Sequence, residues 1–351
     1  MCWVTKCSYI RVVMKVNYSL QSKDLHSVAS EAAWAEKMGY DSISSNETAH
    51  DSFLPLVLAA TSTSHIKLQT HVAIAFPRSP MTMAYTAHDL HVLSSGRLRL
   101  GIGTQVKGHI ERRFSTTWNS PGPRLKEYVQ ALRKIWECWE TGEPLNYSGK
   151  YYQFSLMTPF FNPGPSGLNM PLICTAAVNP YNCSVAGEIS DGLLLHSLTS
   201  PEYVRKIVIP GIQKGSVKAG RNPSDLFLGG GGFIITGPTQ YSLAVQKEHL
   251  RRRISFYSST RTYFPVLETH GLLEVGQRLH KLSVEGRWDD MPRLITDEIL
   301  NVFAIVGEYD EIAPKFLERY GNLLDEVNFS MQTTSNEEEN QLRTIIQQFQ
   351  S

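Results

Sequence analysis

Residues 12–45 read VVMKVNYSLQSKDLHSVASEAAWAEKMGYDSISS and contain one complete strand–helix–strand unit. The segments 12–18 and 40–45 are short and rich in residues that favour strands. Between them, Asp24 can cap a helix whose apolar residues fall on one face, and Gly39 follows as the glycine that ends it. Such a unit is the building block of a parallel sheet covered by helices.

The same alternation continues to the end of the chain. Further strands are predicted at residues 66–76, 97–104, 172–177, 192–196, 226–236 and 327–331. Helices are predicted at 80–93, 123–140 and 336–350, a small hairpin at 145–154, and a mostly helical insertion at 254–300. Eight strand-then-helix steps predict an α/β fold, a (β/α)8 TIM barrel with insertions after strands 4 and 7. We expect residues 14–351 to form this one domain and residues 1–13 to be an N-terminal extension that need not be ordered.

Composition and charge bound the function. Of the 351 residues, 42% are hydrophobic and 19% are charged, which suits a globular protein with a large core. A formal net charge of +1 gives no field that would favour nucleic acid or an acidic membrane surface. No apolar run reaches the roughly 20 residues that span a bilayer, and the N-terminus lacks the apolar core of a signal peptide. The five cysteines show no CxxC pair and no zinc spacing, which indicates reduced thiols in a cytoplasmic protein without a metal site.

In a parallel barrel the chemistry lies at the carboxyl ends of the strands, so the residues that follow each strand are the candidates. Strand two is followed by a carboxylate, a hydroxyl and an imidazole, at Glu47, Thr48 and His50. A polar loop that only caps the next helix through Asp51 is the alternative. Strand six ends at His196, a candidate substrate contact for which a structural role is the alternative.

Strands four and five end in small residues that let a ligand approach the backbone. A flat ring or a phosphate can lie against Gly101 and Gly103, although glycines in a strand are often only packing contacts. The spacing of the next glycine excludes a dinucleotide fingerprint. The loop 177–180 precedes a helix N-terminus that can seat a phosphate, with an ordinary Asn-Pro helix start as the alternative. The basic run 251–253 lies within a helix and is interpreted as a solvated or salt-bridged face.

Several stretches between Met14 and Met331 are typical of one known family. They are residues 47–48, 50–56, 75–82, 96–105, 109–114, 156–165, 185–188, 190–192 and 285–289. On these stretches the chain resembles the luciferase-like monooxygenase superfamily, and more narrowly its coenzyme-F420-dependent oxidoreductase branch. The resemblance implies a flavin-like ring at the barrel mouth, a non-proline cis peptide within residues 71–75 against that ring, and the cofactor phosphate near the loop after strand five.

The resemblance also implies roles for particular residues. The enzyme would transfer a hydride between coenzyme F420 and a small organic substrate, with Glu47 the first candidate for a polar group near the ring or the reacting atom. His109 and Glu111 are the next candidates for acid–base catalysis. The expected cofactor-binding residues are Val72, Ala73, Ile74, Gly101, Gly103, Thr104, Ala177, Val178, Asn179 and Pro180, and the expected substrate contacts are His50 and His196.

Two positions depart from the pattern of this branch. Thr48 stands where related enzymes commonly place a histidine, and Asn179 stands where a glycine is more common. The alternatives are an FMN-dependent monooxygenase of the same fold and a non-catalytic barrel that binds a flavin or another ligand. We expect a homodimer whose partner is a small molecule, with neither nucleic acid nor membrane bound. Aromatic residues of the insertions would line the substrate pocket or serve in packing: Phe160, Phe161, Tyr257, Tyr263 and Phe264.

Overall fold

Parallel strands close into a barrel in the computed structural model, which describes residues 13–22 and 24–351. The strands of the barrel are β1 (Lys15–Ser19), β2 (Ser42–Ser45), β3 (Lys67–Thr70), β4 (Ala73–Ile74), β5 (Leu98–Gly103), β8 (Leu172–Ala176), β9 (Gly192–Leu194), β10 (Phe227–Gly230) and β13 (Glu326–Asn328). Their order is β3-β2-β1-β13-β10-β9-β8-β5-β4, and a further pairing of β3 with β5 joins the two ends. Because β3 and β4 are two parts of strand three, the predicted eight-stranded barrel is confirmed. Apart from Val13, the predicted N-terminal extension lies outside the described residues.

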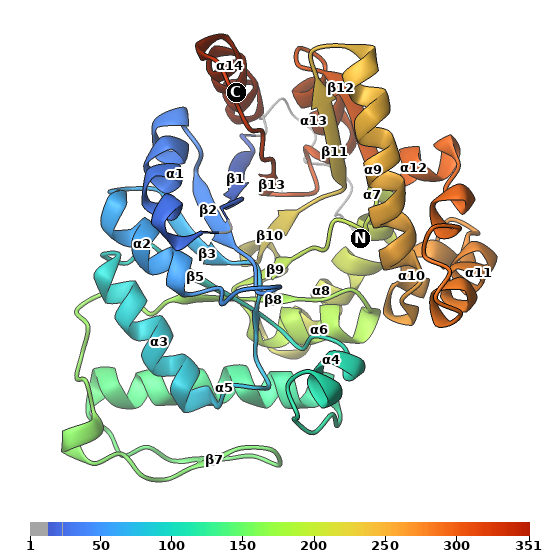
Figure 1. Cartoon of the computed structure of the whole chain (residues 1–351). Coiled ribbons are helices and arrows are strands. Elements are labelled where there is room, and N and C mark those ends of the chain that lie inside the picture. Colours follow the sequence, from blue (N-terminus) through green and yellow to red (C-terminus); the bar gives the residue numbers. More distant parts are fainter. Residues whose placement is uncertain (1–12, 23) are drawn as a thin grey trace.

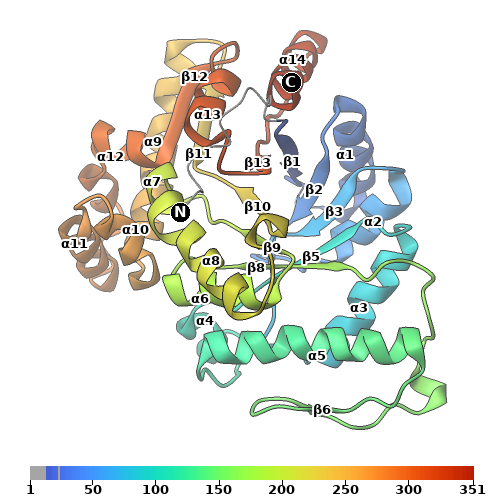
Figure 2. The ribbon, with the colours of Figure 1, turned by 180° about the vertical axis from the view of Figure 1, so that it is seen from behind.

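Helices surround the strands on all sides (Figure 1), and Figure 2 shows the same ring from behind. The longer ones are α1 (Leu25–Met38), α2 (Leu54–Ser62), α3 (Pro80–Leu93), α5 (Pro121–Thr141), α6 (Pro180–Ile189), α8 (Ile209–Lys218), α9 (Gln240–Ser258), α11 (Leu273–Val284), α13 (Ile312–Tyr320) and α14 (Asn336–Gln350). The shorter ones are α4 (Lys107–Arg112), η1 (Pro159–Phe161), α7 (Pro201–Tyr203), η2 (Val204–Val208), η3 (Pro223–Asp225), η4 (Arg261–Tyr263), α10 (Phe264–Glu268), η5 (Met291–Leu294) and α12 (Asp297–Phe303).

The first helix illustrates how the local sequence sets these elements. The Asp24 side chain accepts a hydrogen bond from the His26 N–H, which satisfies one of the free donors at the start of α1. At the other end Gly39 has a φ of 97°, a left-handed conformation that suits glycine. Its N–H donates back to the carbonyls of Ala35 and Glu36. Both predicted ends of the helix are therefore confirmed.

The insertion after strand four has the predicted form. It contains the antiparallel hairpin of β6 (Tyr147–Ser148) and β7 (Gln153–Phe154). The hairpin and η1 extend beside α5 at the edge of the molecule (Figures 1 and 2). Phe160 on η1 is 89% exposed and Phe161 is also exposed, so these two aromatic side chains lie on the outer surface.

The prediction for strand seven was wrong in one respect. Residues 226–236 were expected to form one strand, but the barrel strand ends at Gly230, and the chain then forms β11 (Phe233–Gly237). β11 pairs in parallel with β12 (Ala304–Glu308) in a separate two-stranded sheet. Gly230 and Gly231 have φ of 126° and 112°, which lets the chain turn out of the barrel there. The second insertion therefore runs from β11 to β12 and exceeds the predicted 254–300; α9 to α12 lie together on one side (Figure 1).

The inside of the barrel holds a buried polar network as well as apolar side chains. Arg99 Nη1 donates to Glu326 Oε1 at 3.0 Å and to Gln69 Oε1 at 2.8 Å. Glu326 is only 1% exposed, and its other oxygen lies 2.9 Å from Ser42 Oγ. Burial raises the pKa of Glu326 above its ordinary value, and the Arg99 charge opposes that rise. This network joins β2, β3, β5 and β13 across the barrel.

Candidate functional site

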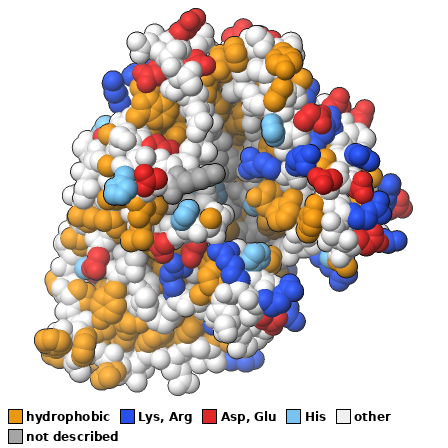
Figure 3. All heavy atoms as spheres, viewed as in Figure 1, with side chains coloured by type: hydrophobic (Ala, Val, Ile, Leu, Met, Phe, Trp, Pro, Cys, Tyr) orange, Lys and Arg blue, Asp and Glu red, His pale blue; other side chains and the backbone are white. Residues whose placement is uncertain are grey.

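A large cavity opens at the carboxyl ends of the barrel strands, where parallel strands deliver their following loops to one face. Its volume is about 1260 Å³. The end of nearly every barrel strand contributes to its wall, through Ser19, Ser45, His71, Ala176, Leu194, Gly232 and Asn328. The exception is strand four, which supplies no wall residue in the described part of the chain. Figure 3 shows the hollow at the centre of this face, with Lys and Arg side chains gathered on its α9 side.

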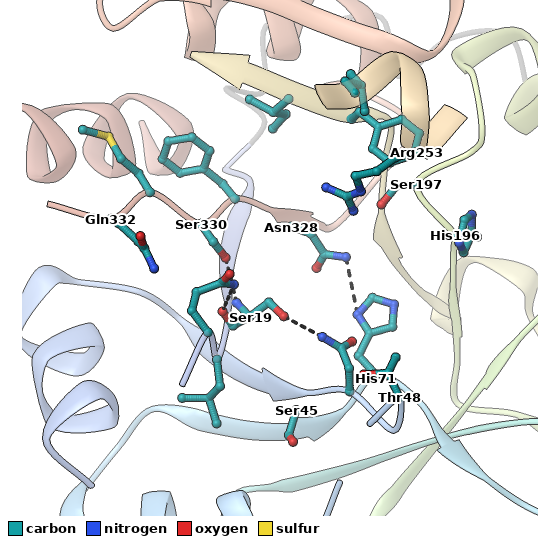
Figure 4. Close-up of a pocket in the computed structure, with 18 of the residues that line it drawn as sticks. Ser19, Ser45, Thr48, His71, His196, Ser197, Arg253, Asn328, Ser330 and Gln332 are labelled. Carbon is teal, nitrogen blue, oxygen red and sulfur yellow. Dashed lines mark hydrogen bonds between the residues drawn. The ribbon is translucent and has the colours of Figure 1, made fainter. Parts of the chain in front are cut away.

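Strand three is interrupted at the cavity, as the family resemblance implied. The peptide bond between His71 and Val72 is cis, within the predicted span 71–75, and it separates β3 from β4. Both residues line the cavity. The His71 ring faces Asn328 from strand eight, with Asn328 Nδ2 3.4 Å from His71 Nδ1 (Figure 4). Residues from opposite ends of the sequence therefore meet on the cavity wall.

Two histidines of the cavity wall are neutral at neutral pH. Burial lowers the pKa of His71 to about 4, and the Arg99 charge contributes. Burial also lowers the pKa of His196 to about 3, with smaller contributions from His71 and Arg253. The Leu198 N–H donates to His196 Nδ1 at 3.0 Å, so the neutral ring carries its proton on Nε2. His196 thus lines the cavity as a neutral hydrogen-bond donor, and its contact with a substrate stays a prediction.

Glu47 is held by the protein itself. Its carboxylate accepts from the Ile74 N–H at 2.7 Å and from Arg78 Nη1 at 2.8 Å, and its side chain is 8% exposed. Glu47 is not among the described residues of the cavity wall, whereas Thr48 and His50 are. The carboxylate is thus occupied by Ile74 and Arg78, and the expectation of a polar group near the ring or the reacting atom stays a prediction for Glu47.

Asp51 caps the helix that follows the loop, as the alternative interpretation of this loop proposed. Its Oδ1 accepts from the N–H groups of Phe53 and Leu54 at the start of α2, as the capping hypothesis proposed. Its Oδ2 forms an ion pair with Arg78 Nη2 at 2.8 Å. In the loop after strand two, Glu47 and Asp51 are thus held by bonds within the protein, while Thr48, His50 and Asp51 itself reach the cavity wall.

The other two acid–base candidates lie on the surface. His109 and Glu111 are both on α4, and both are exposed. Glu111 Oε1 lies 3.9 Å from Lys107 Nζ, an exposed pair one helical turn apart. Neither candidate is a described wall residue of the cavity. The sequence places them just after strand four, but the chain enters a helix there that turns their side chains away.

Gly101 and Gly103, two of the expected cofactor residues, are packed closely against strand three. A Cβ at Gly101 would overlap the Thr70 carbonyl oxygen, and a Cβ at Gly103 would lie 2.9 Å from Val72 Cγ2. These glycines therefore let strand four approach strand three closely. Of the ten expected cofactor residues, Val72 alone belongs to the described cavity wall; Ala73, Ile74, Gly101, Gly103 and Thr104 lie outside it.

Polar groups of the loop after strand five also form hydrogen bonds within the protein. The Asn179 side chain accepts from the Asn182 N–H at 2.8 Å and caps α6, Pro180 has no N–H, and the Cys183 N–H donates to the Asn179 carbonyl. The start of α6 therefore offers few free donors for the predicted phosphate. From this region it is Ala176, just before Ala177 and Val178, that reaches the cavity wall.

Sequence reasoning missed a cation of the cavity. The solvated or salt-bridged interpretation is confirmed for Arg251, which pairs with Glu248 and Asp297, and for Arg252, which lies 3.2 Å from Asp289. Arg253 instead lines the cavity. Helical phase could have shown this, because the α9 wall residues recur at 246, 249, 250, 253 and 257.

The described residues contain neither a cluster of metal-ligating side chains nor a helix that could span a membrane. Within 13–22 and 24–351, His, Cys, Asp and Glu side chains nowhere gather in threes or more in a way that would hold a metal ion. Over the same residues, every helix is too short or too polar to cross a membrane.

Comparison with known proteins gives consistent matches along the chain. The family model described as luciferase-like monooxygenase matches residues 11–326. An uncharacterized protein of Mycobacterium tuberculosis is 40% identical over 300 residues, covering 85% of this chain and 88% of that protein. A 5,10-methylenetetrahydromethanopterin reductase of Archaeoglobus fulgidus is 27% identical, covering 81% and 83%. A putative coenzyme F420-dependent oxidoreductase of M. tuberculosis is 26% identical, covering 80% and 83%.

Solved structures share the barrel. The coenzyme F420-dependent tetrahydromethanopterin reductase of Methanopyrus kandleri matches with a TM-score of 0.74 and 18% identity, covering 95% of this chain and 98% of that one. The oxygenating constituent of 3,6-diketocamphane monooxygenase from Pseudomonas putida, in complex with FMN, matches with a TM-score of 0.66 and 16% identity, covering 96% and 98%. At these identities the likeness concerns the fold.

Proposed function

This chain belongs to the luciferase-like monooxygenase family, and from that premise we propose that it transfers a hydride between coenzyme F420 and a small organic substrate. Family members are oxidoreductases and monooxygenases that depend on F420 or FMN. The F420 assignment is supported by the relative named as an F420-dependent oxidoreductase, which matches over most of both chains. The cavity at the barrel mouth would be the site.

The observation that carries the proposal is the cavity itself. At about 1260 Å³ it exceeds the roughly 300–1000 Å³ of ordinary small-molecule pockets, so it has room for a tricyclic ring and a second molecule. Val72 and Ala176 present small apolar side chains on which a flat ring can lie. His71, Asn328 and Ser45 present polar groups suited to the ring's polar edge. These residues fit a deazaflavin or a flavin ring, and they would hold it.

A bound deazaflavin supplies the hydride chemistry, while the chain's own residues bind, orient and exclude water. His196 can donate its Nε2 proton in a hydrogen bond to an alcohol or carbonyl oxygen of the substrate. With a pKa of about 3 it binds an additional proton poorly, so it acts as a neutral donor that orients and polarises that oxygen. Glu47 would act as a positioning residue, because it fixes the Ile74 N–H next to the cis peptide.

Cofactor titrations test this proposal. Purified protein is titrated separately with F420 and with FMN, and binding is followed by difference absorbance and by fluorescence. We expect saturable binding of F420 and weaker binding of FMN. Tight FMN binding without F420 binding would contradict the F420 assignment and support the monooxygenase alternative. A folded protein that binds neither cofactor would support the non-catalytic barrel. The expected homodimer stays a prediction that light scattering can check.

A further inference from the structure

One wall of the cavity is built by a single face of α9. Gln246, His249, Arg253 and Tyr257 line the cavity, at intervals of three or four residues that place them on one side of the helix. The α9 helix belongs to the second insertion, so this wall is separate from the strand ends that form the rest of the cavity. A ligand that lies on the strand ends would therefore have the lining face of α9 beside it.

Arg253 has an open guanidinium on this wall. Its Cζ lies 5.2 Å from the centre of the Phe233 ring, which also lines the cavity. No carboxylate of the described residues lies within 4 Å of it, in contrast to its neighbours Arg251 and Arg252. The residues outside the described part, 1–12 and 23, contain no Asp or Glu that could pair with it.

The remaining charges of the cavity wall do not neutralise Arg253. Asp51 is the acidic residue among the described wall residues, and it is paired with Arg78 at 2.8 Å. His71 and His196 are neutral at pH 7 because burial lowers the pKa of each. Among the described residues, no carboxylate therefore pairs with the positive charge of Arg253, which lies next to the aromatic rings of Phe233 and Tyr257. A guanidinium of this kind binds carboxylates and phosphates well, often through two parallel hydrogen bonds.

We propose that Arg253 binds an anionic group of the substrate, a carboxylate or a phosphate, while Phe233 and Tyr257 contact its apolar part. The inference rests on the proposed function and narrows it, since it selects acids among small organic substrates. His249, four residues before Arg253 on the same face, is placed to add a second hydrogen bond. The F420 tail carries the same anionic chemistry, so the experiment must separate the substrate from the cofactor.

The first measurement uses the protein without cofactor and two probes of equal shape. Benzoate carries the charge, and benzamide is its neutral counterpart. Binding is measured by calorimetry or ligand-observed NMR for wild type, Arg253→Met and the matched control Arg252→Met. We expect benzoate to bind wild type and Arg252→Met alike, and to bind Arg253→Met at least about tenfold more weakly, as for the loss of one charge-assisted pair. Benzamide should bind all three proteins equally.

The second measurement is the F420 dissociation constant of the same three proteins. Equal F420 affinity in all three, together with the benzoate result, supports a substrate subsite. If Arg253→Met loses F420 affinity and keeps benzoate affinity, the anion belongs to the cofactor and the substrate assignment is overturned. Benzoate that binds Arg253→Met as well as wild type, or that fails to bind wild type, also overturns it. If benzoate behaves as expected and F420 binds none of the proteins, the anion subsite stands and the proposed function fails.

Discussion

Arg99 inside the barrel and Arg253 on the cavity wall place the same side chain in opposite surroundings. Both guanidinium groups lie over an aromatic ring, at 3.8 Å from the centre of Phe227 for Arg99 and at 5.2 Å from that of Phe233 for Arg253. Arg99 also has a carboxylate partner, Glu326, at 3.0 Å. Among the described carboxylates, Arg253 has none within 4 Å.

The difference separates side chains that hold the fold from side chains that are available to a ligand. A charge inside a protein must be paired, because an unpaired charge there loses its hydration without compensation. A charge on an open cavity keeps water as its partner and can exchange that water for a ligand. We therefore expect substitutions of paired interior charges such as Arg99 to lower stability. Substitutions of charges on the open cavity, such as Arg253, should weaken ligand binding instead.

The largest effect is expected for Arg99→Met. The substitution removes the cationic partner of Glu326, which is 1% exposed and keeps only the Ser42 hydroxyl among the described side chains. Removal of one partner of a buried pair costs about 3–5 kcal/mol. Urea unfolding followed by circular dichroism would measure this loss in the free energy of unfolding. The double variant Arg99→Met with Glu326→Leu should recover part of this loss. A loss below about 1 kcal/mol in the single variant would contradict the claim that the buried pair of Arg99 and Glu326 stabilises the fold.

Glu47→Gln tests whether Glu47, in the loop after strand two, stabilises the fold as Arg99 does. The amide lacks the negative charge that pairs with Arg78 and replaces one of the two acceptor oxygens with an NH2 donor, so we expect a loss of about 1.5–3 kcal/mol in the free energy of unfolding. F420 affinity should fall as well, because Val72 lies next to the braced segment. A Glu47 that acts in acid–base catalysis gives the reverse pattern, in which stability and F420 affinity are kept and turnover is lost.

The pH dependence of stability tests whether the His196 ring is neutral in the folded protein. Its pKa is lowered from 6.5 to about 3 in the folded protein, so the unfolded chain takes up a proton first as the pH falls. Its contribution to stability is present above pH 6.5 and is lost as the pH falls toward 3. From pH 7 to 5.5 this amounts to about 1 kcal/mol.

In His196→Gln the free energy of unfolding should fall by about 1 kcal/mol less between pH 7 and pH 5.5 than in wild type. Urea unfolding at the two pH values would measure this difference. His26→Gln is the matched control, because His26 is exposed on α1. An unchanged pH slope in His196→Gln would mean that the ring is protonated in the folded protein, and the neutral-donor role would fail.

The barrel could be predicted from sequence because its signals are local. Strand and helix periods, the Asp24 cap and Gly39 all act within a few residues, and both ends of the first helix appear where they were predicted. The break after Gly230 could not be placed in the same way. The partner of β11 is β12, about seventy residues later along the chain, and the pairing decides where strand seven leaves the barrel.

The candidate site was harder to predict because pairing decides which polar residues stay open. Glu47 and Arg78 are 31 residues apart, and no local pattern shows that they meet. The same holds for Gly101, whose role depends on the Thr70 carbonyl of the neighbouring strand. The position of His196 on the cavity wall could be predicted because it directly follows a strand, and that of Arg253 could not because its helix was treated as uniform.

The smallest effect on stability is expected for Arg253→Met, and this is the sharpest test of the comparison. A substitution on an exposed surface usually changes the free energy of unfolding by less than about 0.5 kcal/mol, and Arg252→Met should match it. Urea unfolding of both variants beside Arg99→Met would measure the contrast in one experiment. A loss above about 1 kcal/mol for Arg253→Met would show that the fold itself uses this guanidinium. If stability is unchanged while benzoate binding falls, Arg253 is dispensable for folding, and the binding of an acid accounts for its place on the cavity wall.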